Sequence, residues 1–238
     1  MSPARLLPAV ASALAALVLL TGCSVFDDLT SSNDPDPAPS ATPSATETPY
    51  PSQFTRDGTF QSHRDIDGMD YVYTLYPTKS TPRTNEWYPK GKKYFSFTFQ
   101  VYDLDRGLRD SFETKRLAYL DRIQVQSNTV TYDGGKVEHP YRLNAEAKKI
   151  TFDPEPVSTK YGMLITSPKG AFELRNQAIK PTSTDTKGID LIFTATVWVE
   201  EAAGSGRFRK EIIRQKVPIS IFKSDQPTQA QSIPVNAN

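Results

Sequence analysis

The sequence predicts an all-β fold, an antiparallel β-sandwich, from two observations. Apolar and polar residues alternate along several segments, and clusters of turn-forming residues separate these segments. Helical patterns do not alternate with the strands, as they would around a parallel sheet. Of the 238 residues, 37% are hydrophobic, which is enough for a packed core.

Three segments carry the strongest strand pattern. In residues 92–102, four apolar side chains alternate with polar ones. Residues 189–200 repeat this pattern and continue through the Gly-containing turn 203–206 into residues 208–222, which predicts a long antiparallel hairpin. Pro218 places the end of that hairpin at a sheet edge or bulge, because proline cannot donate to a ladder of hydrogen bonds.

Weaker strand patterns occur at residues 71–76, 119–126, 129–132, 149–152 and 172–179. One short helix is expected at residues 110–116. Asp110 and Glu113 have the spacing of an N-cap and an N3 residue, and Lys115 and Arg116 suit the last turn.

The strand pattern resembles, in architecture, the immunoglobulin-like sandwiches of secreted bacterial lipoproteins. The Cys and Trp spacing of true immunoglobulin domains is absent. The body of about 170 residues is longer than that sandwich, which has about 100. We therefore expect one sandwich with long insertions around residues 77–91 and 153–170, with two small packed sandwiches as the alternative.

Residues 1–22 have the pattern of a signal peptide, with Arg5 before an apolar core. They end at the sequence Leu20-Thr21-Gly22-Cys23, which resembles the lipobox of bacterial lipoproteins. The resemblance implies that Cys23, the sole cysteine, carries a lipid and holds the protein on the extracytoplasmic side of a cell membrane. An ordinary secretory cleavage site and an uncleaved anchor helix are the alternatives.

The composition divides the mature chain into three parts. Residues 23–55 are rich in Pro, Ser and Thr and are expected to form a disordered stalk, either bare or O-glycosylated. The folded domain is expected over residues 56–223 and a flexible tail over 224–238. Residues 56–238 hold 27 bases and 22 acids, whereas the whole chain has a net charge of +1 and gives no reason to expect a nucleic-acid partner.

Candidate catalytic groups are few. The two histidines, His63 and His139, have no nucleophile motif nearby and are interpreted as polar loop positions, so no catalytic residue and no cofactor are predicted. Residues 65–70 and 103–105 are acidic but lack the spacing of a calcium loop, so no metal site is predicted. A pair of facing carboxylates, as in glycosidases, depends on the fold.

Residues 87–94 form the candidate ligand-binding segment, because aromatic residues and lysines interleave around Pro89 and Gly91. The candidate residues are Trp87, Tyr88, Lys90, Lys92, Lys93 and Tyr94. Aromatic faces stack on sugars or on partner side chains, and lysines attract anionic polymers or lipid headgroups. In the alternative interpretation, Trp87 and Tyr88 cap the end of the sandwich and the lysines keep the next strand soluble.

These features predict a membrane-anchored extracytoplasmic lipoprotein whose β-sandwich binds an envelope component, either a glycan or a lipid. An accessory subunit of a membrane protein complex is one alternative. An envelope hydrolase that uses a carboxylate pair is the other.

Overall fold

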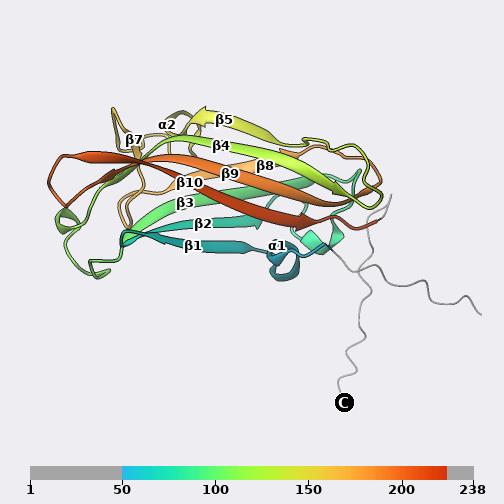
Figure 1. Cartoon of the computed structure of the whole chain (residues 1–238), viewed down its shortest axis with the longest axis horizontal. Helices are drawn as coiled ribbons and strands as arrows, with labels where there is room; N and C mark the ends of the chain where they lie inside the picture. Colours follow the sequence, from blue (N-terminus) through green and yellow to red (C-terminus); the bar gives the residue numbers. More distant parts are fainter. Residues whose placement is uncertain (1–49, 224–238) are drawn as a thin grey trace, which may run out of the picture. The chain divides into compact units, whose positions relative to one another are not determined.

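The computed structural model describes residues 50–223. They form two antiparallel β-sheets packed face to face, so the predicted all-β sandwich is confirmed (Figure 1). The signal peptide, the lipobox with Cys23, the stalk up to residue 49 and the tail 224–238 lie outside the described residues. Within residues 50–223, no helix is long and apolar enough to cross a membrane.

The two sheets, A and B, differ in size. Sheet A has the strand order β1-β2-β3-β8, and sheet B has the order β10-β9-β4-β7-β6, with β5 also paired to β4. The strands of sheet A are β1 (Phe60–Ile66), β2 (Met69–Pro77), β3 (Lys93–Asp103) and β8 (Phe172–Ile179). The strands of sheet B are β4 (Ala118–Thr131), β5 (Arg142–Glu146), β6 (Ser158–Thr159), β7 (Gly162–Leu164), β9 (Thr186–Glu200) and β10 (Phe208–Ser220).

The core between the sheets is largely aromatic. The ring of Tyr73 lies 4.3 Å from that of Phe99 in sheet A and 5.7 Å from that of Phe193 in sheet B. Phe97 also reaches across the sandwich, with its ring centroid 5.0 Å from that of Phe193. The buried side chains of both sheets form one cluster, as expected for one large sandwich.

The strongest strand predictions match β3, β9 and β10. The last two form the predicted hairpin, and β10 is an edge strand in which Pro218 lies opposite Asp190. The patterns at 119–126 and 129–132 belong to one strand, β4. The register of β4 against β9 shifts between Leu120 and Arg122. Because of this irregularity, the alternation of buried and less buried side chains along β4 loses phase there.

The helices differ from the prediction. The helix expected at residues 110–116 is only a 3-10 turn, η2 (Phe112–Thr114), because the carboxylate of Asp110 accepts from the Gly107 amide at 2.8 Å and does not cap a helix. Two short α-helices occur elsewhere, α1 (Gln53–Asp57) and α2 (Ala147–Ile150). The strand predicted at 149–152 is therefore wrong. A helical turn there buries Ala147 against the core instead.

The folded domain begins before residue 56, where the sequence analysis placed its start. The Tyr50 hydroxyl donates to Asp190 at 2.8 Å, the Ser52 hydroxyl accepts from the Thr55 amide, and Phe54 is fully buried. Residues 50–55 therefore belong to the sandwich and not to the stalk. Their Pro, Ser and Thr content resembles that of the stalk, but Tyr50 and Phe54 attach them to the folded domain.

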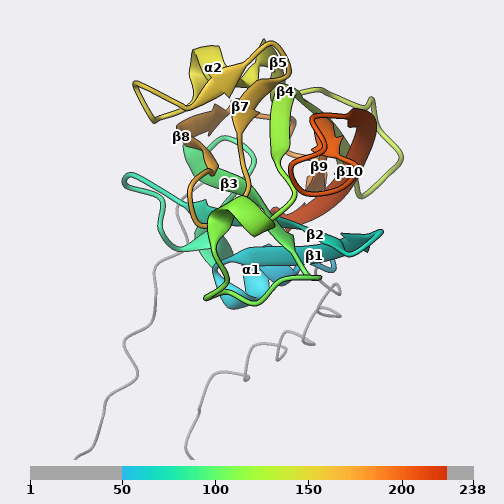
Figure 2. The same cartoon turned by 90° about the vertical axis from the view of Figure 1, so that its left-hand side faces the viewer.

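The sandwich has two ends that carry different loops (Figure 1). At the end that we call proximal, the described chain begins at Tyr50, next to α1, a second 3-10 turn η1 (Thr84–Glu86) and the β2–β3 connection. The opposite, distal end holds the turn between β1 and β2, the β3–β4 connection and the tip of the β9–β10 hairpin. Figure 2 views the molecule from the distal end.

Candidate functional site

Trp87, the first candidate residue of the predicted binding segment, is a core residue. It is only 2% exposed, and its ring lies against that of Phe54. The indole nitrogen donates to the Thr81 carbonyl at 3.1 Å. A ring this deeply buried offers no face to a ligand, so the assignment of Trp87 as a ligand contact is corrected and it closes the proximal end of the core.

Lys93 is also buried, with 1% of its surface exposed. Its ammonium group donates to the carbonyl oxygens of Tyr88, Pro89 and Gly91, each at 2.9 Å. Burial, together with the nearby charge of Lys90, lowers the pKa of Lys93 to about 8. Lys93 therefore supports the backbone of the loop and is corrected from a candidate ligand contact to a structural residue.

The other four candidate residues, Tyr88, Lys90, Lys92 and Tyr94, reach the surface. The Tyr88 ring lies so close to Gly91 that a Cβ at that glycine would be 2.4 Å from the ring. The ammonium group of Lys79 lies 4.4 Å from the centroid of the Tyr94 ring. Both tyrosine rings thus have partners within the protein, while the two lysines are exposed to solvent.

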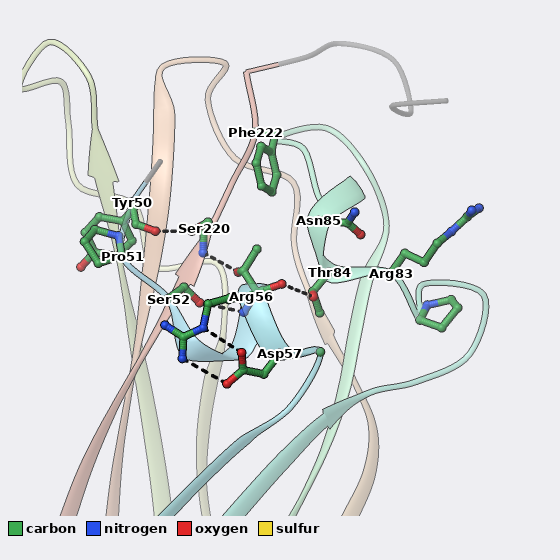
Figure 3. Close-up of a pocket in the computed structure, with 13 residues that line it drawn as sticks. Tyr50, Pro51, Ser52, Arg56, Asp57, Arg83, Thr84, Asn85, Ser220 and Phe222 are labelled. Carbon is green, nitrogen blue, oxygen red and sulfur yellow. Dashed lines mark hydrogen bonds and ion pairs between the residues drawn. The ribbon is translucent and has the colours of Figure 1, made fainter. Parts of the chain in front are cut away.

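A hollow of about 690 Å³ opens beside α1 at the proximal end (Figure 3). Its polar groups bond to one another. The Ser52 hydroxyl donates to the Pro218 carbonyl at 2.7 Å, the Ser220 amide donates to the Thr55 hydroxyl at 2.9 Å, and the Thr84 hydroxyl donates to the Thr55 carbonyl at 3.1 Å. These bonds fasten the first described residues to β10 and η1, so we assign this hollow a structural role.

A second pocket, which we call the distal pocket, lies on the outer face of sheet A and has a volume of about 570 Å³. Its floor is formed by His63, Asp70 and Tyr102, from β1, β2 and β3. The three side chains point outward, and Asp70 alternates with the buried Met69 and Tyr71. Three adjacent strands therefore bring polar side chains to one site.

The β3–β4 connection forms the rim of the distal pocket, and it lies in front of the sheet in Figure 2. This connection places Leu104 and Leu108 at the surface, where they are 53% and 80% exposed. The other residues around the pocket are Asp103, Arg106, Gly107, Lys115, Ser167 and Pro168. The rim thus presents two exposed leucines among polar residues, and the floor is polar.

The carboxylate of Asp70 is the least satisfied group of the distal pocket. Its Oδ2 atom lies 2.7 Å from Nδ1 of His63. Its Oδ1 atom is buried and has no hydrogen-bond partner among the described residues. A buried carboxylate oxygen without a donor is unfavourable, so Asp70 holds an unsatisfied acceptor among the residues that line the pocket.

The acidic segments 65–70 and 103–105 lie close together near the distal end. The cation between them is the guanidinium of Arg116. Its Nη2 atom lies 2.6 Å from Oδ1 of Asp103 and 2.7 Å from Oδ2 of Asp105, and Nη1 donates to the Asp67 carbonyl. Burial alone raises the pKa of Asp103, but the hydrogen bonds and charge of Arg116 outweigh burial and hold that pKa below its usual value. The guanidinium neutralises the carboxylates, and residues 50–223 contain no cluster of side chains suited to a metal ion.

The sequence analysis missed the distal pocket. It placed His63 in a loop, whereas this residue lies in β1, opposite Val72 of β2. The signal present in the sequence was a pair of leucines, Leu104 and Leu108, in an otherwise polar connection. Only the strand register brings that connection beside His63 and Asp70.

No protein-family model matches the chain, and no curated protein matches it.

Proposed function

We propose that the protein is a membrane-anchored extracytoplasmic lipoprotein whose sandwich binds an amphiphilic envelope component, such as a lipid, in the distal pocket. The observation that carries this proposal is a pair of exposed leucines, Leu104 and Leu108, at the rim of a pocket whose floor holds a buried carboxylate oxygen that lacks a donor. The anchor part rests on the Leu20-Thr21-Gly22-Cys23 motif, with its sole cysteine after an apolar segment.

The chemistry of the distal pocket favours a ligand with an apolar chain and a hydrogen-bond donor. A volume of about 570 Å³ lies within the range of small-molecule sites. Covering Leu104 and Leu108 would remove apolar surface from water, which contributes roughly 25 cal/mol for each Å² buried. A hydroxyl or ammonium group of the ligand would supply the hydrogen bond that Oδ1 of Asp70 lacks.

The position of the distal pocket suits an anchored binding module. The β3–β4 connection, which lines the pocket, lies at the end of the sandwich opposite α1, close to which the described chain begins (Figure 1). In a chain held through Cys23, the pocket would face away from the point of attachment. A ligand outside the anchoring membrane could then reach it.

A glycan is a second candidate ligand, because three half-exposed aromatic residues lie together on the outer face of sheet B. The ring of Tyr161 lies 4.4 Å from that of Phe208 and 5.3 Å from that of Trp198. Rings in such a group can stack on sugars. These rings already stack on each other, however, and no unsatisfied polar atom accompanies them among the described residues.

Photo-crosslinking in native membranes tests the proposal. A benzophenone amino acid replaces Leu108 in one variant and Val157, which is 61% exposed and lies outside the distal pocket, in the control. We expect an adduct with the mass of a lipid at position 108 and none at 157. Equal labelling at both positions, or none at position 108, would contradict the proposed pocket, and a protein adduct at 108 would favour an accessory subunit instead.

The anchor is tested separately by metabolic labelling with a fatty-acid analogue. The wild type should take up the label and Cys23→Ser should not. Equal labelling of the two proteins would refute the lipoprotein assignment.

A further inference from the structure

We propose that the proximal end of the sandwich is a cationic surface that docks on anionic lipid headgroups. The orientation of this surface rests on the proposed lipid anchor, but the residues that form it are independent of the distal pocket. Docking would hold the domain against the bilayer in addition to its tether.

Backbone hydrogen bonds join the loops of the proximal end into one surface. The Thr182 amide donates to the Pro89 carbonyl at 3.0 Å, and the Phe222 amide donates to the Trp87 carbonyl at 2.9 Å. The segment after β10 is fixed in the same way to the start of β9, through the Ile221 amide. Charges on these loops therefore have fixed relative positions.

Six lysines lie on these loops or, for Lys187, at the start of β9: Lys79, Lys90, Lys92, Lys180, Lys187 and Lys223. All are exposed except Lys187, which is half-buried. None of the six forms an ion pair with a carboxylate within residues 50–223. At the distal end Arg116, Arg207 and Arg209 each pair with an acid, whereas Arg106 and Arg109 form no ion pair within residues 50–223. The loops of the proximal end also carry the acids Asp133, Glu138 and Asp185, which the unpaired lysines outnumber, so this end has an excess of positive charge.

Four of the basic residues of this end surround a hollow of about 720 Å³ in the β2–β3 connection: Lys79, Arg83, Lys90 and Lys92. Glu86 is the only acid that lines it, and this residue pairs with Arg83 at 2.9 Å. A hollow bordered by four basic residues and one acid attracts a phosphate-bearing headgroup. The buried Lys93 holds the floor of the loop in place through three carbonyl groups.

The proposed tether enters the folded domain at the proximal end. Cys23 precedes Tyr50, and Tyr50 lies at the proximal end beside α1 (Figure 3). Attraction between lysines and an anionic bilayer acts over about one Debye length, roughly 8 Å at physiological salt. A tether that begins at the proximal end keeps this surface near the bilayer, where the attraction is effective.

The test uses the full lipid-bearing protein in vesicles of phosphatidylcholine, with or without phosphatidylglycerol. A dye is attached to Ser80→Cys at the proximal end or to Ala203→Cys at the distal end. Because the proposed lipid blocks the thiol of Cys23, the introduced cysteine is the free one. Energy transfer from the dye to an acceptor lipid reports how close each end lies to the bilayer.

We expect phosphatidylglycerol to increase energy transfer from position 80 and not from position 203. The double variant Lys90→Glu with Lys92→Glu should reduce the docked population roughly tenfold or more. The control Lys160→Glu with Lys210→Glu makes the same change in net charge on the outer face of sheet B and should keep the effect. Energy transfer that is equal in both kinds of vesicle, or lost equally in the control, would overturn the proposal.

The outcome for docking can be separated from the outcome for the anchor. If the chain carries no lipid, it will fail to float with vesicles of phosphatidylcholine alone, and the proposed anchor fails. Flotation with vesicles that contain phosphatidylglycerol then measures docking directly. Binding that Lys90→Glu with Lys92→Glu abolishes would still support the cationic surface, and absence of binding would reject it.

Discussion

The ring of Trp87 lies against the ring of Phe54, with centroids 5.5 Å apart and planes inclined by 59°. One of these residues was expected in the stalk and the other in an exposed binding segment. Both are buried, and together they close the proximal end of the core. The stalk assignment of Phe54 and the ligand-contact assignment of Trp87 therefore failed for the same reason, because each of these aromatic residues has its partner in a distant part of the chain. The alternative interpretation, in which Trp87 caps the end of the sandwich, agrees with its burial.

Trp87→Ala should lower the free energy of unfolding by roughly 3 to 5 kcal/mol, because it removes a large buried ring and leaves a cavity. Lys90→Ala, three residues away and exposed, should change it by less than about 0.5 kcal/mol. Chemical denaturation of the two variants measures this difference. Similar stability of both would show that the ring contributes little to the core.

The strand prediction succeeded where burial follows a strict alternation. In β3, Phe95, Phe97 and Phe99 point into the core and alternate with the polar residues Ser96 and Thr98, so the pattern alone identifies the strand. It failed at α2, where a helical turn buries Ala147 and the local sequence has no helical pattern that would predict this turn. Segments whose contacts are distant in sequence, such as residues 50–55, could not be assigned locally.

The hydroxyl of Tyr73 is buried in the aromatic core and has no hydrogen-bond partner among the described residues. Burial raises the pKa of Tyr73. Tyr73→Phe removes this unsatisfied group without changing the ring, so it should stabilise the protein by about 1 to 2 kcal/mol.

Tyr141→Phe is the matched control for Tyr73, because the Tyr141 hydroxyl donates to Gln177 at 2.9 Å. This control should be neutral or destabilising. Thermal unfolding compares the two variants, and destabilisation by Tyr73→Phe would indicate that its hydroxyl is satisfied in solution.

The depressed pKa of Lys93 predicts a dependence of stability on pH. The folded protein releases this proton near pH 8, whereas a lysine in the unfolded chain holds it to about pH 10.4. Between these values the unfolded state binds more protons, so stability should rise with pH, by at most roughly 3 kcal/mol. Lys93→Met should lack this rise when unfolding free energies are compared from pH 7 to about pH 9.5, below the ordinary range of tyrosine. The same slope in both proteins would contradict the assignment.

Arg116 compensates the buried charge of Asp103, whose side chain is 2% exposed. Arg116→Met leaves this carboxylate buried without its partner and should cost about 3 to 5 kcal/mol. Arg116→Lys should not restore full stability, because an ammonium cannot reproduce the bonds to Asp103, Asp105 and the Asp67 carbonyl.

The lowered pKa of Asp103 adds a second test of the same pair. A depressed carboxylate pKa stabilises the folded state above the pKa in the unfolded chain, about 3.9, and this contribution is lost as the pH falls through the folded value. The wild type should therefore lose more stability on acidification than Arg116→Met. Denaturation at pH 7 and at about pH 3 checks this, and equal losses would argue against the pair.

The candidate site shows where inference from sequence ends. Residues 65–70 and 103–105 are acidic without the spacing of a calcium loop, and the structure shows that the carboxylates of the second segment pair with Arg116. The pairing of His63 with Asp70 depends on the register of β1 and β2, which a single sequence does not determine. Leu104 and Leu108 are recognised as part of the rim of the distal pocket only when the positions of β3 and of the β3–β4 connection are known.

Native mass spectrometry of the protein extracted from membranes tests the central claim, that the distal pocket binds an amphiphile, most directly. The wild type and the control Val157→Asp should each carry a non-covalent ligand with the mass of a lipid. The variant Leu104→Asp with Leu108→Asp should lose it, because charge on the rim opposes an apolar chain. Equal occupancy in all three proteins, or no bound lipid in the wild type, would contradict the account.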